Sequence, residues 1–256
     1  MIRRIALLIL PGLILSGVVG FTALAADDAL PKAETILDRY IEVTGGKAAY
    51  EKRKTEVAKG MLEMASQGVK AAVTRYSTAP DKSYSLLEID GAGKIESGAG
   101  NGIAWDNSAM MGPHLKSGEE KTQALREAMF NAQLDWRKLY SKVETAGVET
   151  IDGEECYKVV MTPEGGGKTE TQYFQKKSGL AVKMTMTLVN QMGEVPAEVL
   201  ISDYKEFGGV LIPTKQVNKA AGQEFTTTIQ SVSVNEEIPP EKFEPPAEIK
   251  ALLNKK

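Results

Sequence analysis

Apolar and polar residues alternate along most of this chain, in short segments separated by turns rich in Gly, Pro, Asn and Asp. A period of two places one set of side chains on the buried face of a sheet and the other set in solvent. The clearest case is the segment 181–189, whose apolar positions are Val182, Met184, Met186 and Leu188. The pattern predicts strands near Glu56–Ala65, Val69–Ser77, Ser83–Asp90, Lys94–Ser97, Ile103–Asn107, Lys142–Ile151, Glu155–Thr162, Thr169–Lys177, Ala181–Val189, Glu198–Glu206, Val210–Asn218 and Phe225–Asn235.

Two segments show the helical period of 3.6 residues instead. The first runs from Pro31 to Val43, and Thr44-Gly45-Gly46 predicts its end, because glycine readily takes the left-handed conformation at a helix terminus. The second runs from about Gly118 to Tyr140 and carries an apolar stripe that includes Met129 and Trp136. A proline-rich extended segment and a short helix at 247–253 are predicted to close the chain.

Eleven or twelve hairpin-linked strands, interrupted once by a helix, predict one large antiparallel sheet. A twisted sheet of this length curls, and its apolar concave face needs a cover. The two amphipathic helices can supply that cover. The predicted fold class is therefore mainly β (α+β): a curved antiparallel half-barrel of about 11 strands, with helices covering the concave face. Such a half-barrel can hold a hydrophobic cavity, or its own side chains can fill the space.

The N-terminus has the pattern of a secretory leader. Arg3 and Arg4 precede an apolar stretch from Ile5 to Val19, and Ala23-Leu24-Ala25 offers the small residues of a cleavage site. The alternative is an uncleaved anchor, but a spanning helix needs roughly 20 apolar residues, and the uninterrupted apolar part is shorter. We expect a signal peptide of the Sec type at 1–25, a single half-barrel domain at 26–246 and a C-terminal tail with a short helix at 247–256.

Charge and cysteine usage exclude several classes of partner. The 31 basic and 34 acidic residues are intermixed and give a net charge of −3, so no basic stripe is available for nucleic acid. Cys156 is the only cysteine, which rules out an internal disulfide, and the leader ends without a cysteine for lipidation. We expect a monomer that is free in the periplasm, or secreted, and is not an integral membrane protein after cleavage.

Several motifs resemble the LolA/LolB-like outer-membrane lipoprotein-sorting proteins. A leader and a first helix ending in Thr44-Gly45-Gly46 come first, then hairpins leading to Gly102-Ile103-Ala104-Trp105-Asp106 and a lid-like helix. The hairpin from Asp203 to Pro213, with its Gly turn and Leu-Ile-Pro strand entry, and the ending Phe243-Glu244-Pro245-Pro246 are the more specific matches. The resemblance implies an eleven-stranded half-barrel covered by helices, with a cavity for acyl chains. The missing lipidation cysteine departs from the anchored branch of the family.

Residues that could carry catalysis are sparse. His114 is the only histidine, which excludes a multi-histidine metal site, and CxxC, HExxH and G-x-S-x-G motifs are absent from the sequence. We expect His114 to be exposed in a loop and Cys156 to be a buried thiol within a strand, without a basic partner. The closely spaced glycines at 91–93 and 98–102 fit β-turns better than phosphate loops. We therefore predict a protein that is not an enzyme and uses no cofactor or metal.

The candidate ligand-binding residues are apolar side chains predicted to face the cavity: Trp105, Met129, Val182, Met184, Met186 and Leu188. Methionine suits such a wall because it is flexible and polarizable, although ordinary core packing would explain the methionines and tryptophans as well. One hypothesis is a periplasmic carrier or sensor of lipid, lipoprotein acyl chains or another hydrophobic ligand. The other is a non-catalytic envelope accessory protein that docks onto a protein partner. A cavity of several hundred Å³ favours the first, and a filled core favours the second.

Overall fold

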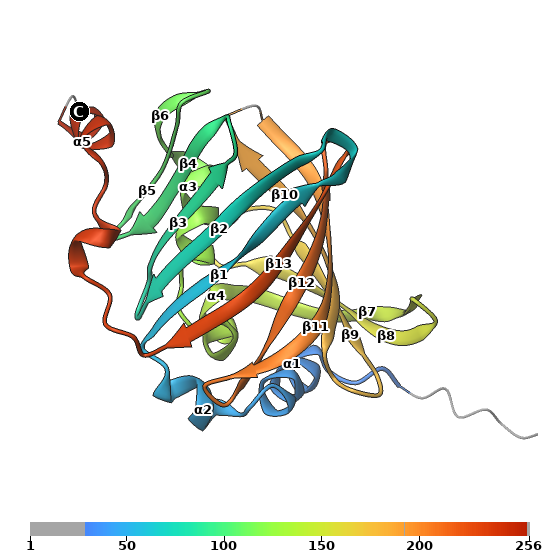
Figure 1. Ribbon diagram of the computed structural model, residues 1–256. Coiled ribbons are helices and arrows are strands. Elements are labelled where there is room, and N and C mark those ends of the chain that lie inside the picture. Colours follow the sequence, from blue (N-terminus) through green and yellow to red (C-terminus); the bar gives the residue numbers. More distant parts are fainter. Residues whose placement is uncertain (1–28, 192, 255–256) are drawn as a thin grey trace, which may run out of the picture.

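The computed structural model describes residues 29–191 and 193–254, so the predicted leader lies outside the described residues. Within these ranges, thirteen strands form one antiparallel sheet in the order β6-β5-β4-β3-β2-β1-β13-β12-β11-β10-β9-β8-β7 (Figure 1). The strands are β1 Thr55–Met64, β2 Val69–Thr78, β3 Lys82–Ile89, β4 Gly93–Gly100, β5 Ile103–Ser108, β6 Gly112–Leu115, β7 Tyr140–Ile151, β8 Glu154–Pro163, β9 Glu170–Gln175, β10 Ala181–Asn190, β11 Gly193–Phe207, β12 Val210–Ala220 and β13 Gln223–Val234. The helical segments are α1 Ala33–Val43, α2 Lys47–Lys52, η1 Ala65–Gln67, α3 Gly118–Glu127, η2 Ala132–Asp135, α4 Trp136–Leu139, η3 Pro240–Phe243 and α5 Ala247–Leu253.

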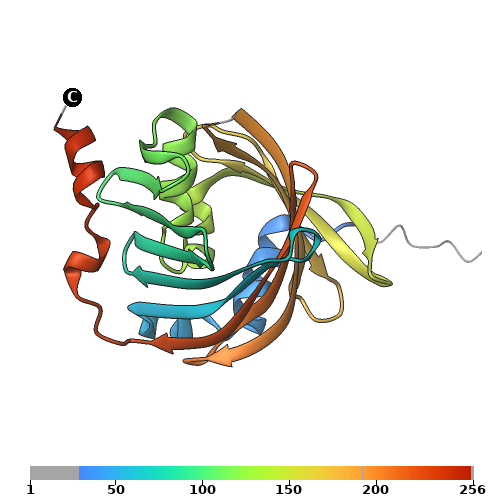
Figure 2. The same ribbon diagram turned by 45° about the horizontal axis from the view of Figure 1, so that its top comes forward.

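The sheet consists of two hairpin meanders joined at its centre. β1 pairs with β13, from Glu56 opposite Val234 to Glu63 opposite Thr226. The first and the last strand of the sequence therefore lie side by side. The sheet does not close, because β6 and β7 remain at its edges. Residues 116–139, which we call the lid segment, connect these edges, and Figure 2 shows α3 and α4 on the concave side of the curled sheet. The predicted fold class, an open antiparallel half-barrel with helices, is confirmed.

Two local predictions are wrong. Gly112–Leu115, expected to be a loop, is the short edge strand β6, which pairs Asp106 of β5 with His114 and raises the strand number to thirteen. The helix expected from Gly118 to Tyr140 stops at Glu127. Asn131 then takes the left-handed conformation, with φ of 55°, and the Phe130 N–H donates to the Pro80 carbonyl at 2.9 Å. Asn tolerates this conformation better than most residues, so a helix readily breaks there.

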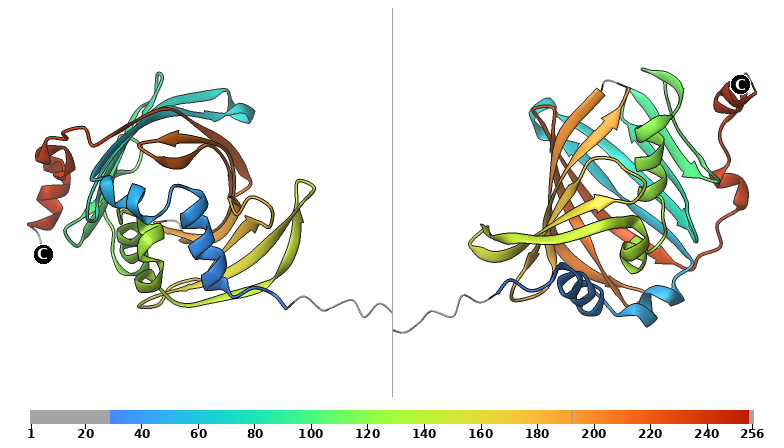
Figure 3. Two further views of the ribbon diagram at one scale, coloured as in Figure 1. Left: turned by 90° about the horizontal axis from the view of Figure 1, so that it is seen from below. Right: turned by 180° about the vertical axis from the view of Figure 1, so that it is seen from behind.

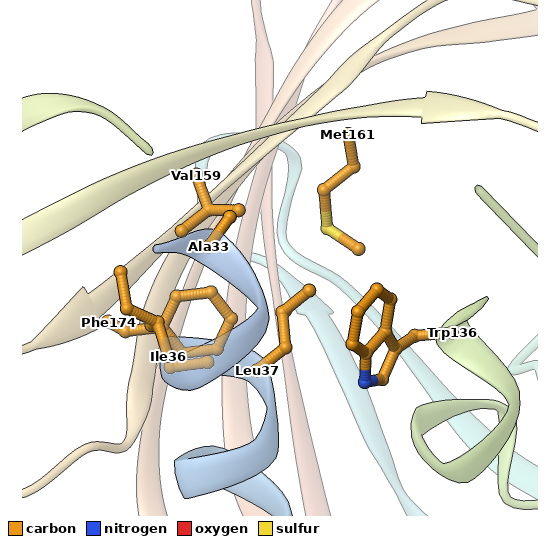
Figure 4. Packing of buried hydrophobic residues seen from close by; sticks show 8 residues of the cluster. Ala33, Ile36, Leu37, Trp136, Val159, Met161 and Phe174 are labelled. Carbon is orange, nitrogen blue, oxygen red and sulfur yellow. The ribbon is translucent and has the colours of Figure 1, made fainter. Parts of the chain in front are cut away.

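A large cluster of buried apolar residues lies between α1 and strands β8 to β10. Ile36 and Leu37 of α1 meet Val159 and Phe174, together with Ala33, Met161, Ala181 and Trp136, all at most 6% exposed (Figure 4). The Tyr40 ring meets Phe174 edge to face, with the centroids 5.5 Å apart. Trp136 belongs to α4, so this cluster fixes one end of the lid segment to α1 and the sheet.

A second cluster lies on the outer face of the sheet, under the C-terminal segment. Trp105 is 1% exposed and packs with Tyr84 and Ile249, and a Cβ at Gly98 would lie 2.5 Å from its ring. Glycine at position 98 therefore makes room for the indole. Figure 3 shows α5 outside the half-barrel, across the sheet from α3. The predicted extended tail contains the turn η3, and Lys242 in it lies over the Tyr76 and Tyr84 rings, at 4.9 and 5.5 Å.

Candidate ligand-binding cavity

In the described part of the chain, two adjoining cavities lie between the lid segment and the concave face of the sheet. The first, which we call the main cavity, has a volume of about 500 Å³ and is bounded mainly by α4 and strands β9 to β12. The second cavity, about 510 Å³, lies between residues 127–133 and strands β1, β2, β12 and β13. Each volume falls in the usual range for small-molecule sites, roughly 300–1,000 Å³. Both cavities are lined by Tyr40, Arg75, Glu127, Ala132, Gln133 and Gln216.

One wall of the main cavity is apolar. Met184 and Met186 of β10 lie opposite Val199 and Ala197 of β11, so their side chains form a continuous strip across the two strands. The strip is extended by Met161, Trp136, Leu139, Leu188, Ile201 and Phe225. Because flexible methionines dominate its centre, the strip can adapt to a chain-like ligand.

The predicted wall residues divide into three groups. Met184, Met186 and Leu188 line the main cavity, and Met129 lines the second cavity. Val182 lines neither, because the register of β10 against β9 shifts between Ala181 and Lys183 and leaves Val182 as the extra residue. Trp105 lies on the outer face, in the cluster under α5. Strict alternation therefore misplaced Val182, whereas Lys183 lies on the face away from Met184, as predicted, and pairs there with Glu198.

A polar cluster lies beside the apolar strip in the main cavity. Arg75 of β2 donates from Nη2 to the backbone carbonyl of Glu127, at 3.1 Å. The Tyr140 hydroxyl donates to the carboxylate of Glu170, which is only 7% exposed. Arg126 lines both the main cavity and a smaller recess of about 210 Å³ beside the glycine loop 165–167. Burial, opposed by Arg75 and Arg126, raises the pKa of the Glu127 carboxyl above its ordinary value.

This cluster was not predicted, although the sequence has charged residues at inward positions of two strands. Arg75 alternates in phase with Ala71 and Val73, which places a charged residue at an inward position of a strand. Glu170 is likewise in phase with the buried Phe174. A charge on the buried side of an alternating strand could have indicated a polar feature inside the half-barrel.

The α3 helix of the lid segment connects the edge strand β6 with β10. On one side, the Gln123 amide bonds to β10, accepting from Val189 N–H at 3.0 Å and donating to the Thr187 carbonyl at 3.3 Å. On the other side, His114 Nε2 of β6 lies 2.8 Å from the carboxylate of Glu120. His114 is thus a quarter exposed and paired in a strand, and is not the exposed loop residue that was predicted.

The far end of the lid segment is fixed to α1. Asp38 accepts hydrogen bonds from Trp136 Nε1 at 3.2 Å and from both Arg137 terminal nitrogens, at 3.0 and 2.7 Å. These charge-assisted bonds hold the pKa of the Asp38 carboxyl below its usual value. Nearby, Asn131 Nδ2 donates to the Tyr50 carbonyl at 2.8 Å. The lid segment is therefore anchored firmly at α4, whereas polar side chains hold α3.

Other site chemistry is limited in the described ranges. Cys156 is fully buried, as expected, and burial raises the pKa of its thiol. Across residues 29–191 and 193–254, no three His, Cys, Asp or Glu side chains gather in a way that could hold a metal ion. Within the same ranges, no helix has the length and apolar character to cross a membrane.

Comparison with known proteins identifies the fold. No family model matches the chain, and a search of the curated proteins finds no relative. A DUF1329 family protein from Desulfovibrio piger has 15% identity and a TM-score of 0.56, over 83% of this chain and 97% of its own. A LolA superfamily protein from Nitrosomonas europaea has 12% identity and a TM-score of 0.57, over 84% and 99%.

A domain from Vibrio parahaemolyticus, assigned to outer membrane lipoprotein sorting, has 14% identity and a TM-score of 0.56, over 86% of this chain and 99% of its own. At such low identity the likeness establishes the fold. The chain has a LolA-like half-barrel fold, so the resemblance found in the sequence is confirmed at that level.

Proposed function

We propose that this protein is a periplasmic carrier or sensor that binds a lipid, a lipoprotein acyl chain or another long-chain hydrophobic ligand in its half-barrel. The observation that carries the proposal is the main cavity of about 500 Å³, with its methionine-rich strip on β10 and β11. Solved structures of the same fold include a LolA superfamily protein and a domain assigned to outer membrane lipoprotein sorting, which supports the same class of ligand.

The energetics of such a carrier are favourable. Each methylene group that leaves water contributes about 0.8 kcal/mol, so a chain of ordinary length gains roughly 10 kcal/mol before association costs. A soluble protein with one such cavity can therefore hold a lipid chain in water. Release requires the lid segment to open or an acceptor that binds the ligand more tightly.

The proposed location rests on the leader pattern at residues 1–25, which lies outside the described residues. The competing hypothesis, a docking protein without a ligand, expected side chains to fill the half-barrel. The two cavities favour the carrier over that hypothesis.

Native mass spectrometry of protein purified from its own envelope tests the proposal. We expect a bound species that organic solvent extracts as lipid, and a delipidated protein that takes up a long-chain lipid with one-to-one stoichiometry. Protein that is repeatedly free of lipid, and that fails to bind any long-chain lipid after delipidation, would argue for the docking protein.

A further inference from the structure

The arginines that face the main cavity differ from the other cations near it. Lys183 is paired with Glu198 at 2.6 Å, and Arg53, beside the second cavity, is paired with Glu56. In the described part of the chain, neither Arg75 nor Arg126 forms an ion pair; Arg75 donates to a carbonyl, and Arg126 has the Tyr140 hydroxyl as its neighbour. Arg75 is exposed and Arg126 is half-buried, and both line the main cavity, so their guanidinium groups are available to an anion that enters it.

These arginines lie beside the apolar strip. Met186 lines the main cavity together with Arg126 and Glu170, and the same three residues also line the recess at the glycine loop. Arg75 and Glu127 lie at the boundary between the main cavity and the second cavity. A single ligand can therefore place a polar group against the arginines while its chain follows β10 and β11.

Building on the proposed function, we propose that the ligand is a long-chain amphiphile with an anionic head group. The head group binds at Arg126 and Arg75, and the chain lies against Met184, Met186 and Val199. Arginine suits this role because its planar fork donates paired hydrogen bonds to carboxylate, sulfonate and phosphate groups.

Glu127 adds a proton linkage to this site. Its side chain is exposed to both cavities, and its enclosure inside the half-barrel raises the pKa of its carboxyl, which favours the protonated form. An anion bound beside it favours that form further, so binding takes up a proton at Glu127 and affinity rises as the pH falls. The ionisable and charged groups that face it are Arg75, Arg126, Lys116 and Glu170, with Tyr40, Tyr50, Arg53, Glu56, Tyr140, Lys183 and Lys219 farther along the cavity walls.

Four amphiphiles of equal chain length test the head-group preference: palmitate, hexadecyl sulfonate, hexadecanol and hexadecyltrimethylammonium, each below its micelle concentration, with delipidated full-length protein. We expect the two anions to bind more tightly than the alcohol, and the cation to bind most weakly. Arg126→Gln should weaken sulfonate binding about tenfold or more, as expected for the loss of a charge-assisted hydrogen bond, and should weaken hexadecanol binding by a much smaller factor. Lys138→Gln is the matched control, because it removes a lid cation that is 79% exposed.

The pH dependence uses hexadecyl sulfonate, whose charge is constant across the range. Its affinity should rise as the pH is lowered from neutral. Glu127→Gln should bind more tightly than the parent at neutral pH and lose most of this dependence. Calorimetry in buffers of different ionisation enthalpy should show proton uptake by the parent protein and less by the variant.

Three outcomes separate the head-group inference from the proposed function. Equal affinity for sulfonate and alcohol, with Arg126→Gln behaving as the parent, overturns the head-group inference and leaves the carrier in place. A preference for the trimethylammonium compound also overturns it. The carboxylates of Glu127 and Glu170 would then make the electrostatic potential at the head-group site negative. If none of the four amphiphiles binds, the carrier function itself fails.

Discussion

Met186→Asp is expected to abolish binding of a long-chain ligand while the protein remains folded. Met186 lies at the centre of the apolar strip and lines the main cavity, so the new carboxylate would keep water where the chain must lie. Removing that water costs several kcal/mol, which would offset much of the gain from burying the chain. The measurement is a titration with hexadecanol. Its head group is neutral, so the new carboxylate cannot weaken binding by repelling a charge on the ligand.

Met110→Asp is the matched control for this substitution. Met110 is 79% exposed at the tip of the β5–β6 hairpin, so the same change of residue should leave binding intact. Circular dichroism must show that both variants are folded. A folded Met186→Asp protein that binds hexadecanol as well as the parent would show that β10 does not line the binding site.

Phe174→Ala is expected to lower the free energy of unfolding by about 3–5 kcal/mol, the usual cost of removing a buried aromatic side chain. Phe174 is 1% exposed and packs against Ile36 and Leu37, as well as the Tyr40 ring. Truncation of this side chain leaves a cavity between α1 and the sheet, and the surrounding residues cannot move enough to fill it. Urea unfolding of the ligand-free protein measures the change.

The loss in unfolding free energy for Phe174→Ala is compared with the loss for Leu188→Ala. Leu188 is only partly buried and borders the main cavity, so its truncation removes fewer contacts and should cost less than about 2 kcal/mol. Similar losses for the two variants would mean that Leu188 is packed as tightly as Phe174. The half-barrel would then be filled by its own side chains, contrary to the proposed carrier.

The alternating pattern predicted most of the sheet because each strand has one face toward the interior. It failed where pairing departs from a strict period of two: at Val182 the shift in register inserts one extra residue between Ala181 and Lys183, and only the pairing with β9 reveals it. The break at Asn131 depends on a hydrogen bond from Phe130 to Pro80, about 50 residues away in the sequence. Short-range propensity cannot include such a partner.

Trp105 shows a different limit. Its position within an apolar strand was predicted, but either face of a sheet can be buried when a distant segment covers the outer one. Here Ile249 and Phe243 cover it, and nothing near residue 105 indicates that they do. For the same reason, the polar cluster of Arg75, Arg126 and Glu170 emerges only when β2, α3 and β9 are brought together.

The positions of the tryptophans allow the central claim, a ligand chain inside the main cavity, to be tested most directly. The chain has two tryptophans: Trp136 lines the main cavity, and Trp105 lies on the outer face under α5. Trp105→Phe and Trp136→Phe each leave one emitter, and a brominated long-chain fatty acid quenches only tryptophans that it touches. We predict strong quenching in Trp105→Phe and little in Trp136→Phe. Quenching of Trp105 alone, or of neither tryptophan while calorimetry records binding, would place the ligand outside the half-barrel.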